Sequence, residues 1–224
     1  MQTPRALSND SNSPPPKRRQ PQVPEPVPSD SGSPPPRGRP APEPVKGKLE
    51  RDDAGYVRSE SLQTALDWWQ FRHPKFRCTA FYMYEAKFTV KLYWKCLKRL
   101  IEEDCDGVGT VLNIGRCHWV AIYVSKKSRT IEYYDPYGTE PSERVRSVLE
   151  RIGRMVGTNL NEFGGRFPVE VSSAHHQHDV TECGLYSLAF LYERGVTGKS
   201  FFACTRGSAI GRSMLDIYCR MWFA

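Results

Sequence analysis

Proline is distributed very unevenly along the 224-residue chain, and this unevenness decides which part of it can fold. Fourteen of the 18 prolines lie in the first 44 residues, whereas every aromatic residue lies at or after Tyr56. Proline removes a backbone hydrogen-bond donor, and a segment with few large apolar side chains has little to bury. We therefore expect residues 1–47 to be a disordered, basic, proline-rich tail and residues 48–224 to form one compact domain.

The proline-rich segment contains two similar units, SPPPKR at residues 13–18 and SPPPR at residues 33–37. Such a composition favours extended polyproline II backbone without a packed core. The basic cluster at residues 17–19 fits two hypotheses. One is a contact with nucleic acid or with the nuclear-import machinery, and the other is a solvated charge cluster that keeps the tail soluble.

Charge and cysteine content narrow the class of protein. The chain has 32 Lys and Arg against 25 Asp and Glu, a formal net charge of +7, which permits a polyanionic partner such as DNA. Its seven cysteines are an odd number and include no C-x-x-C pair, so free thiols in a reducing compartment are expected and structural zinc sites are disfavoured. The sequence has no secretory signal pattern and no apolar run of about 18–20 residues, so we expect an intracellular protein without membrane contact.

Hydrophobic periodicity gives a coarse secondary structure for the domain. Apolar residues recur at helical spacing in four segments and at strand spacing in four others. The predicted helices cover residues 61–71, 89–103, 184–194 and 210–222, and the predicted strands cover 79–84, 117–124, 129–134 and 167–171. The strands at 117–124 and 129–134 are joined by a short polar turn and should form an antiparallel hairpin. The pattern predicts an α+β domain with a small central mixed or antiparallel sheet flanked by helices.

Polar residues stand at the ends of the hairpin strands, where packing alone would not require them. His118 begins one buried strand, and Asp135 directly follows the next. In an antiparallel hairpin the start of one strand lies beside the end of its neighbour, so the two side chains are expected to be adjacent. The carboxylate would then orient the imidazole and leave its other nitrogen for a nucleophile.

Cys183 is the candidate nucleophile. It lies in the first turn of a predicted helix, where unpaired backbone N–H groups and the helix dipole favour a thiolate. Gln177 lies six residues earlier, and its amide can donate to a developing oxyanion alongside the backbone N–H of Cys183. Gly184 would let a substrate backbone approach closely. Together these residues predict nucleophilic catalysis by a thiol.

Each of these residues also has an ordinary structural explanation. A histidine at a strand start is commonly a satisfied structural residue, an aspartate before proline commonly opens a turn, and a lone cysteine is commonly a core thiol. The order and spacing of the four residues together favour the catalytic interpretation. The histidines at positions 175, 176 and 178 crowd one short loop without a nearby cysteine pair, so we expect no metal site.

The stretches HWVAIYV, IEYYDPYG and QHDVTECGLYSLAFL resemble the adenovirus-protease and SUMO-protease superfamily of cysteine peptidases, from about residue 110 to the C-terminus. The resemblance implies the papain-like fold of that superfamily. It also implies roles for the matching residues: general base for His118, orienting acid for Asp135, nucleophile for Cys183 and oxyanion donor for Gln177. Members commonly place an aromatic residue after the histidine as the roof of a narrow channel that admits glycine, and Trp119 is the matching residue here.

Within the superfamily, the segment ECGLYSL and the C-terminal helical pattern resemble proteases of large DNA viruses. That branch implies a cysteine endopeptidase that cleaves viral structural precursors after Gly-Gly or Gly-x pairs during virion maturation. It would act as a monomer in the host nucleus or cytoplasm and in the virion, on protein substrates with glycine-rich cleavage sites. This chemistry requires no cofactor. The positive charge makes DNA a candidate activator, and an activating peptide is a second candidate.

Two other functions remain open from the sequence. One is a cellular-type protease of SUMO or another ubiquitin-like modifier. The other is an inactive module that binds nucleic acid through its basic surface. The complete set of His118, Asp135, Gln177 and Cys183 argues against the inactive module, because an idle descendant would be free to lose one of them.

Overall fold

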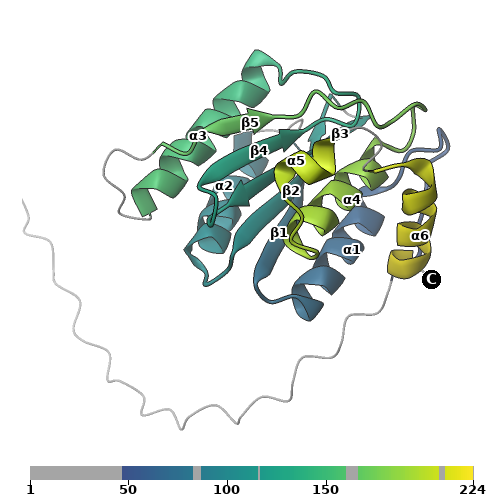
Figure 1. Ribbon diagram of the computed structural model, residues 1–224, viewed down its shortest axis with the longest axis horizontal. Coiled ribbons are helices and arrows are strands. Elements are labelled where there is room, and N and C mark those ends of the chain that lie inside the picture. Colours follow the sequence, from purple (N-terminus) through teal and green to yellow (C-terminus); the bar gives the residue numbers. More distant parts are fainter. Residues whose placement is uncertain (1–46, 83–86, 116, 160–165, 207–209, 224) are drawn as a thin grey trace, which may run out of the picture. The chain divides into compact units, whose positions relative to one another are not determined.

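The computed structural model describes residues 47–223, except 83–86, 116, 160–165 and 207–209 (Figure 1). The predicted tail lies outside the described residues apart from its last position, so its disorder stays a prediction. In the part of the chain that the structure describes, no helix combines the length and apolar character needed to cross a membrane.

The centre of the domain is a five-stranded mixed sheet with the strand order β1-β2-β3-β4-β5. The outer pairs β1–β2 and β4–β5 are parallel, and the inner pairs β2–β3 and β3–β4 are antiparallel. Parallel pairs need crossover connections, which the helices provide. The strands are β1 Phe76–Tyr82, β2 Gly107–Ile114, β3 His118–Ser125, β4 Thr130–Tyr134 and β5 Val169–Val171.

Helices cover both faces of this sheet, as Figure 1 shows. One face packs against α1 Ser59–Arg72, α4 Cys183–Gly195 and the C-terminal helices α5 Phe201–Thr205 and α6 Arg212–Phe223. The other face packs against α2 Lys87–Glu102 and α3 Glu143–Asn159. The predicted α+β class with a mixed sheet between helices is therefore confirmed.

Strand β3 shows why the sequence forms a two-sided core. Trp119 and Ala121 belong to the cluster under α1 and α4, whereas Val120 and Ile122 belong to the cluster under α2 and α3. Successive side chains of a strand point to opposite faces, so a strand that is buried on both sides reads as a continuous apolar run.

The predicted antiparallel hairpin is also confirmed, with Ala121 opposite Tyr134 and Ser125 opposite Thr130. Because of this register, the start of β3 and the end of β4 lie at the same end of the sheet. The first residue of α4 lies at that end too, since the Trp119 backbone N–H donates to the Cys183 Sγ at 3.4 Å. The hairpin and α4 together position the candidate site.

The sequence pattern did not predict β2, α3 or the short helix α5. The pattern in α3 is amphipathic, with Val145, Leu149, Ile152 and Val156 buried on the sheet. In β2, two glycines weaken the strand signal, and both are required by close packing. A Cβ at Gly107 would lie 2.0 Å from the Tyr123 hydroxyl, and one at Gly109 would lie 2.9 Å from the Phe76 ring.

Candidate active site

The imidazole of His118 and the carboxylate of Asp135 are in direct contact. His118 Nε2 lies 3.0 Å from Asp135 Oδ1, so the sequence-based expectation that they are adjacent is met. The same carboxylate oxygen accepts a hydrogen bond from the Tyr137 backbone N–H at 2.9 Å. The Asp135 side chain is buried, whereas the His118 side chain is 21% exposed.

The proton affinity of His118 follows from these contacts. Burial by itself lowers the pKa of His118, but hydrogen bonds to Asp135 and Cys183 outweigh it and raise the pKa to about 9. The imidazole thus lies between an acid that orients it and a thiol that can give it a proton. This arrangement is the one that a general base for a thiol nucleophile needs.

Cys183 is the first residue of α4 and is almost completely buried. Its Sγ accepts the Trp119 backbone N–H at 3.4 Å and lies 3.6 Å from the carbonyl oxygen of Cys117. The N-cap residue Glu182 makes no side-chain capping bond to this helix end. The first-turn N–H groups therefore keep their partial positive charge beside the thiol.

Gln177 lies in the loop before α4 and is fully buried. Its backbone N–H donates to the Pro136 carbonyl at 3.0 Å, which ties the loop to the segment that follows Asp135. Its side-chain Nε2 donates to the Asp179 carbonyl at 2.8 Å, and its Oε1 has no hydrogen-bond partner among the described residues. The same Nε2 also lies 3.5 Å from Asp179 Oδ1, so the amide group is engaged within the loop. Donation from it to an oxyanion stays a prediction.

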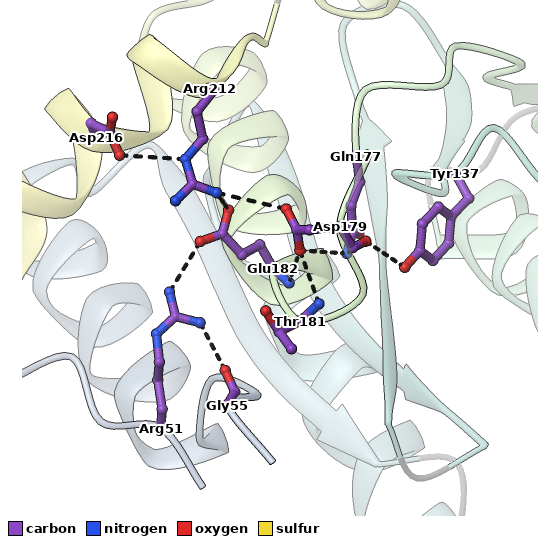
Figure 2. A network of polar contacts seen from close by, with 9 residues as sticks. All are labelled: Arg51, Gly55, Tyr137, Gln177, Asp179, Thr181, Glu182, Arg212 and Asp216. Carbon is purple, nitrogen blue, oxygen red and sulfur yellow. Dashed lines mark hydrogen bonds and ion pairs between the residues drawn. The ribbon is translucent and has the colours of Figure 1, made fainter. Parts of the chain in front are cut away.

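Tyr137 contacts both His118 and the loop before α4, and the sequence pattern did not indicate it as a site residue. Its ring stacks on the His118 ring with centroids 5.2 Å apart and planes 23° apart. Its hydroxyl donates to the Asp179 carbonyl at 2.7 Å, close to Gln177, as Figure 2 shows. Its position in the sequence, two residues after Asp135, could have indicated that it belongs to the site.

Trp119 lines a cleft of about 220 Å³ beside the nucleophile. The opposite wall comes from the segment before α1 and includes Tyr56. Asn113 lies opposite Trp119 in the β2–β3 register and also lines the cleft. Its buried Oδ1 has no hydrogen-bond partner within the described part of the chain. Tyr56 and Asn113 are separated from the motif in sequence, which is why the motif did not indicate them.

Gly184 has close neighbours on the protein side. A Cβ at this position would lie 3.3 Å from both methyl carbons of Leu62 and 3.5 Å from Trp119 Cδ1. The absence of a side chain therefore lets α4 pack closely on α1. This contact accounts for the glycine through packing, and a direct contact of Gly184 with substrate stays a prediction.

The three histidines of the loop before α4 have different surroundings. His176 is buried, with its Nδ1 2.9 Å from the Tyr134 hydroxyl. His175 Nε2 lies 2.6 Å from the Gln177 carbonyl, and the His175 ring stacks on that of His178. These contacts give the loop internal support.

A larger cavity, of about 960 Å³, lies at the other end of the sheet. It is lined by residues from the turn between β3 and β4 and from the end of α4, including Arg194 and Glu132. No predicted site residue lines it. Its size alone therefore does not make it the reactive site.

Residues 94–201 match the family described as Ulp1 protease family, C-terminal catalytic domain. The matched range starts before the resemblance expected from residue 110 and includes His118, Asp135, Gln177 and Cys183. A SUMO-1 cysteine protease of African swine fever virus is 27% identical over 173 residues, which cover 64% of this chain and 59% of the relative. The chain thus matches less than two thirds of that relative's length.

Solved structures show the same fold. The crystal structure of an African swine fever virus protease covers 83% of this chain and 70% of its own, with a TM-score of 0.61 and 21% identity. The SUMO protease Ulp1, with its catalytic cysteine oxidised to a sulfonic acid, covers 76% of this chain and 77% of its own, with a TM-score of 0.56 and 15% identity. The likeness therefore extends well beyond the motif residues.

Proposed function

We propose, from the premise that residues 94–201 belong to the Ulp1 protease family, that the chain is a cysteine endopeptidase with Cys183 as its nucleophile. One observation carries the proposal. The imidazole of His118 contacts the Asp135 carboxylate, and the thiol of Cys183 at the N-terminus of α4 accepts the backbone N–H of Trp119, the residue that follows His118. A thiol, a base and an orienting acid in this order are the parts that thiol-dependent acyl transfer needs.

The reaction would proceed through an acyl-enzyme. His118 takes the thiol proton, and the Cys183 thiolate attacks the carbonyl carbon of the scissile bond. The resulting oxyanion accepts hydrogen bonds from the Cys183 backbone N–H and from Gln177 Nε2. The imidazolium then protonates the leaving amine, and the C–N bond breaks to give a thioester. His118 next deprotonates a water molecule, whose attack releases the acid product and restores the thiol.

The substrate class follows from the cleft beside the nucleophile. Its volume of about 220 Å³ between Tyr56 and Trp119 suits an extended peptide with small residues. We infer cleavage after Gly-Gly or Gly-x pairs in viral structural precursor proteins. The protease name of the African swine fever virus relative supports the viral assignment.

A peptide library tests this proposal directly. The purified chain should cut peptides after glycine pairs, and the Cys183→Ala variant should cut none. A Trp119→Ala variant, which opens the cleft, should accept larger residues before the cut. Absence of cleavage in the whole library, together with absence of labelling by a glycine-based thiol probe, would overturn the endopeptidase proposal.

The alternative substrate is a folded ubiquitin-like modifier. It is favoured by the fold shared with the SUMO protease Ulp1. Incubation with SUMO and ubiquitin vinyl probes separates the two. Covalent labelling of Cys183 by a modifier probe would favour the modifier protease, and peptide cleavage without such labelling would favour the precursor protease.

A further inference from the structure

The residue that precedes the nucleophile is a buried acid held between two arginines. The Glu182 side chain is only 7% exposed. Its Oε1 accepts from Arg51 Nη2 at 3.2 Å, and its Oε2 accepts from Arg212 Nη1. Figure 2 shows the carboxylate between the two guanidinium groups. A buried carboxylate needs such partners, because an unpaired buried charge is costly.

Arg212, near the C-terminus of the chain, connects Glu182 to the rest of the loop before α4. This loop, residues 172–182, is called the nucleophile loop below. Arg212 is the first residue of α6, and its Nη1 also lies 3.6 Å from Asp179 Oδ2. The other oxygen of Asp179 accepts the backbone N–H groups of Thr181 at 2.9 Å and Glu182 at 3.0 Å. The position of α6 is thereby tied to the backbone that leads into Cys183.

Arg51, near the start of the domain, connects Glu182 to the cleft lined by Tyr56 and Trp119, called the substrate cleft below. Its Nη1 donates to the Gly55 carbonyl at 2.8 Å. Gly55 adopts a positive φ of 86°, and a Cβ there would lie 3.5 Å from Thr181 Cγ2. The next residue, Tyr56, lines the cleft. The turn that carries one cleft wall thus packs against the nucleophile loop.

We propose that Glu182 is a positioning residue that holds the substrate cleft and the nucleophile loop in one arrangement. Through Arg51 it fixes the wall that carries Tyr56. Through Arg212 it fixes the loop that carries Gln177 and leads into Cys183. This inference rests on the proposed peptidase function and extends it to residues outside the reacting set.

The two arginines should have separable effects on peptide cleavage. Arg212→Gln frees the loop that presents the thiol, so kcat should fall about 10-fold with little change in KM. Arg51→Gln frees the cleft wall, so KM should rise about 10-fold with little change in kcat. Glu182→Gln removes the shared charge and should change both constants. Arg51→Lys keeps a cation and should restore part of the lost affinity.

A matched control separates positioning from general loss of an ion pair. Arg77 makes a partly buried pair with Glu103 at 2.5 Å, at the start of β1 and away from the site. Arg77→Gln should leave both constants within about twofold of the parent. The thermal midpoint of each variant is measured in parallel, so that kinetic changes are compared among folded proteins.

The proposal has an independent readout in the alkylation of Cys183 by chloroacetamide, followed by mass spectrometry of the modified peptide. Slower alkylation in Glu182→Gln and Arg212→Gln, and not in Arg77→Gln, supports positioning even if no peptide is cut. Failure of the parent chain to cut any peptide while Cys183 alkylates would count against the peptidase function alone. Unchanged alkylation and unchanged kinetic constants in all three network variants would overturn the positioning role.

Discussion

Helix α4 carries a polar contact at each end, and the two ends differ in how completely they are satisfied. At its C-terminal end, Arg194 donates to both oxygens of Glu132 through Nε at 2.6 Å and Nη2 at 2.5 Å. The third nitrogen donates to the Lys199 carbonyl, and the guanidinium lies over the Tyr123 ring. The side chains are 8% and 1% exposed, so this pair is largely shielded from solvent.

The polar groups at the N-terminal end of α4 are not all paired with one another in this way. The Asp135 carboxylate contacts one nitrogen of the His118 ring, and the candidate nucleophile Cys183 accepts the backbone N–H of the next residue, Trp119. The cleft lined by Trp119 lies beside this thiol. A polar cluster whose members are all satisfied supports the fold, whereas one that holds a nucleophile near a base can do chemistry.

Replacement of the Cys183 thiol should have the largest effect on peptide cleavage. It tests whether the N-terminal end of α4 is the reactive one. Cys183→Ser removes the thiolate, so peptide cleavage should fall about 10⁴-fold or more. The thermal midpoint should change little, because the side chain keeps its size. Cys219→Ser on α6 is the control and should cleave normally. Substantial turnover in the Cys183→Ser protein would place the nucleophile elsewhere.

Disruption of the Arg194–Glu132 pair at the C-terminal end of α4 should lower stability and leave catalysis intact. Arg194→Met leaves the buried Glu132 carboxylate without its partner, so the free energy of unfolding should fall by about 3–5 kcal/mol. Urea unfolding measures the loss, and cleavage at low temperature measures the activity of the folded fraction. A large fall in kcat at unchanged stability would contradict the distinction between the two ends.

The oxyanion role of Gln177 is tested by truncation of its amide. Gln177→Ala should lower kcat about 10²-fold with little change in KM, because the donor acts mainly in the transition state. Steady-state kinetics on one peptide measures both constants. Since Gln177 also ties the loop through Asp179, thermal midpoints should be recorded for the same variant. A decrease smaller than about twofold would remove Gln177 from the oxyanion hole.

The pH dependence of stability should show the smallest effect. The pKa of His118 is about 9 in the folded chain and ordinarily 6.5, so the protonated ring stabilises the fold. That contribution is complete below pH 6.5 and is lost as the pH rises towards 9. Asp135→Asn removes most of it, so the parent should exceed this variant by about 2 kcal/mol at pH 6 and by less at pH 9. Urea unfolding at both values checks the trend, and a constant difference would contradict it.

Local patterns in the sequence predicted the core of the fold and the meeting of the site residues. The apolar run of β3 and the polar turn after it specified a hairpin, and the hairpin alone placed His118 beside Asp135. Strand β2 was missed because Gly107 and Gly109 obscure its pattern, although both glycines accommodate neighbouring rings. The glycines weaken the strand pattern in the local sequence, but the reason for them lies in tertiary packing against residues distant in the sequence.

Long-range contacts around the site could not be predicted in the same way. Nothing near Arg51 or Arg212 in the sequence indicates that both side chains meet Glu182, since these contacts span 131 and 30 residues. Tyr137 was closer to hand, because it belongs to the same motif as Asp135. Its contact with Asp179 still required the fold, which brings the two loops together.

The β3–β4 turn lies at the far end of the hairpin from His118, and its residues 127–129 are exposed. A fluorophore or affinity tag attached there would sit on the solvent side of the domain, well separated from the reacting thiol. Immobilisation through this turn would therefore leave the cleft accessible for single-molecule observation of cleavage.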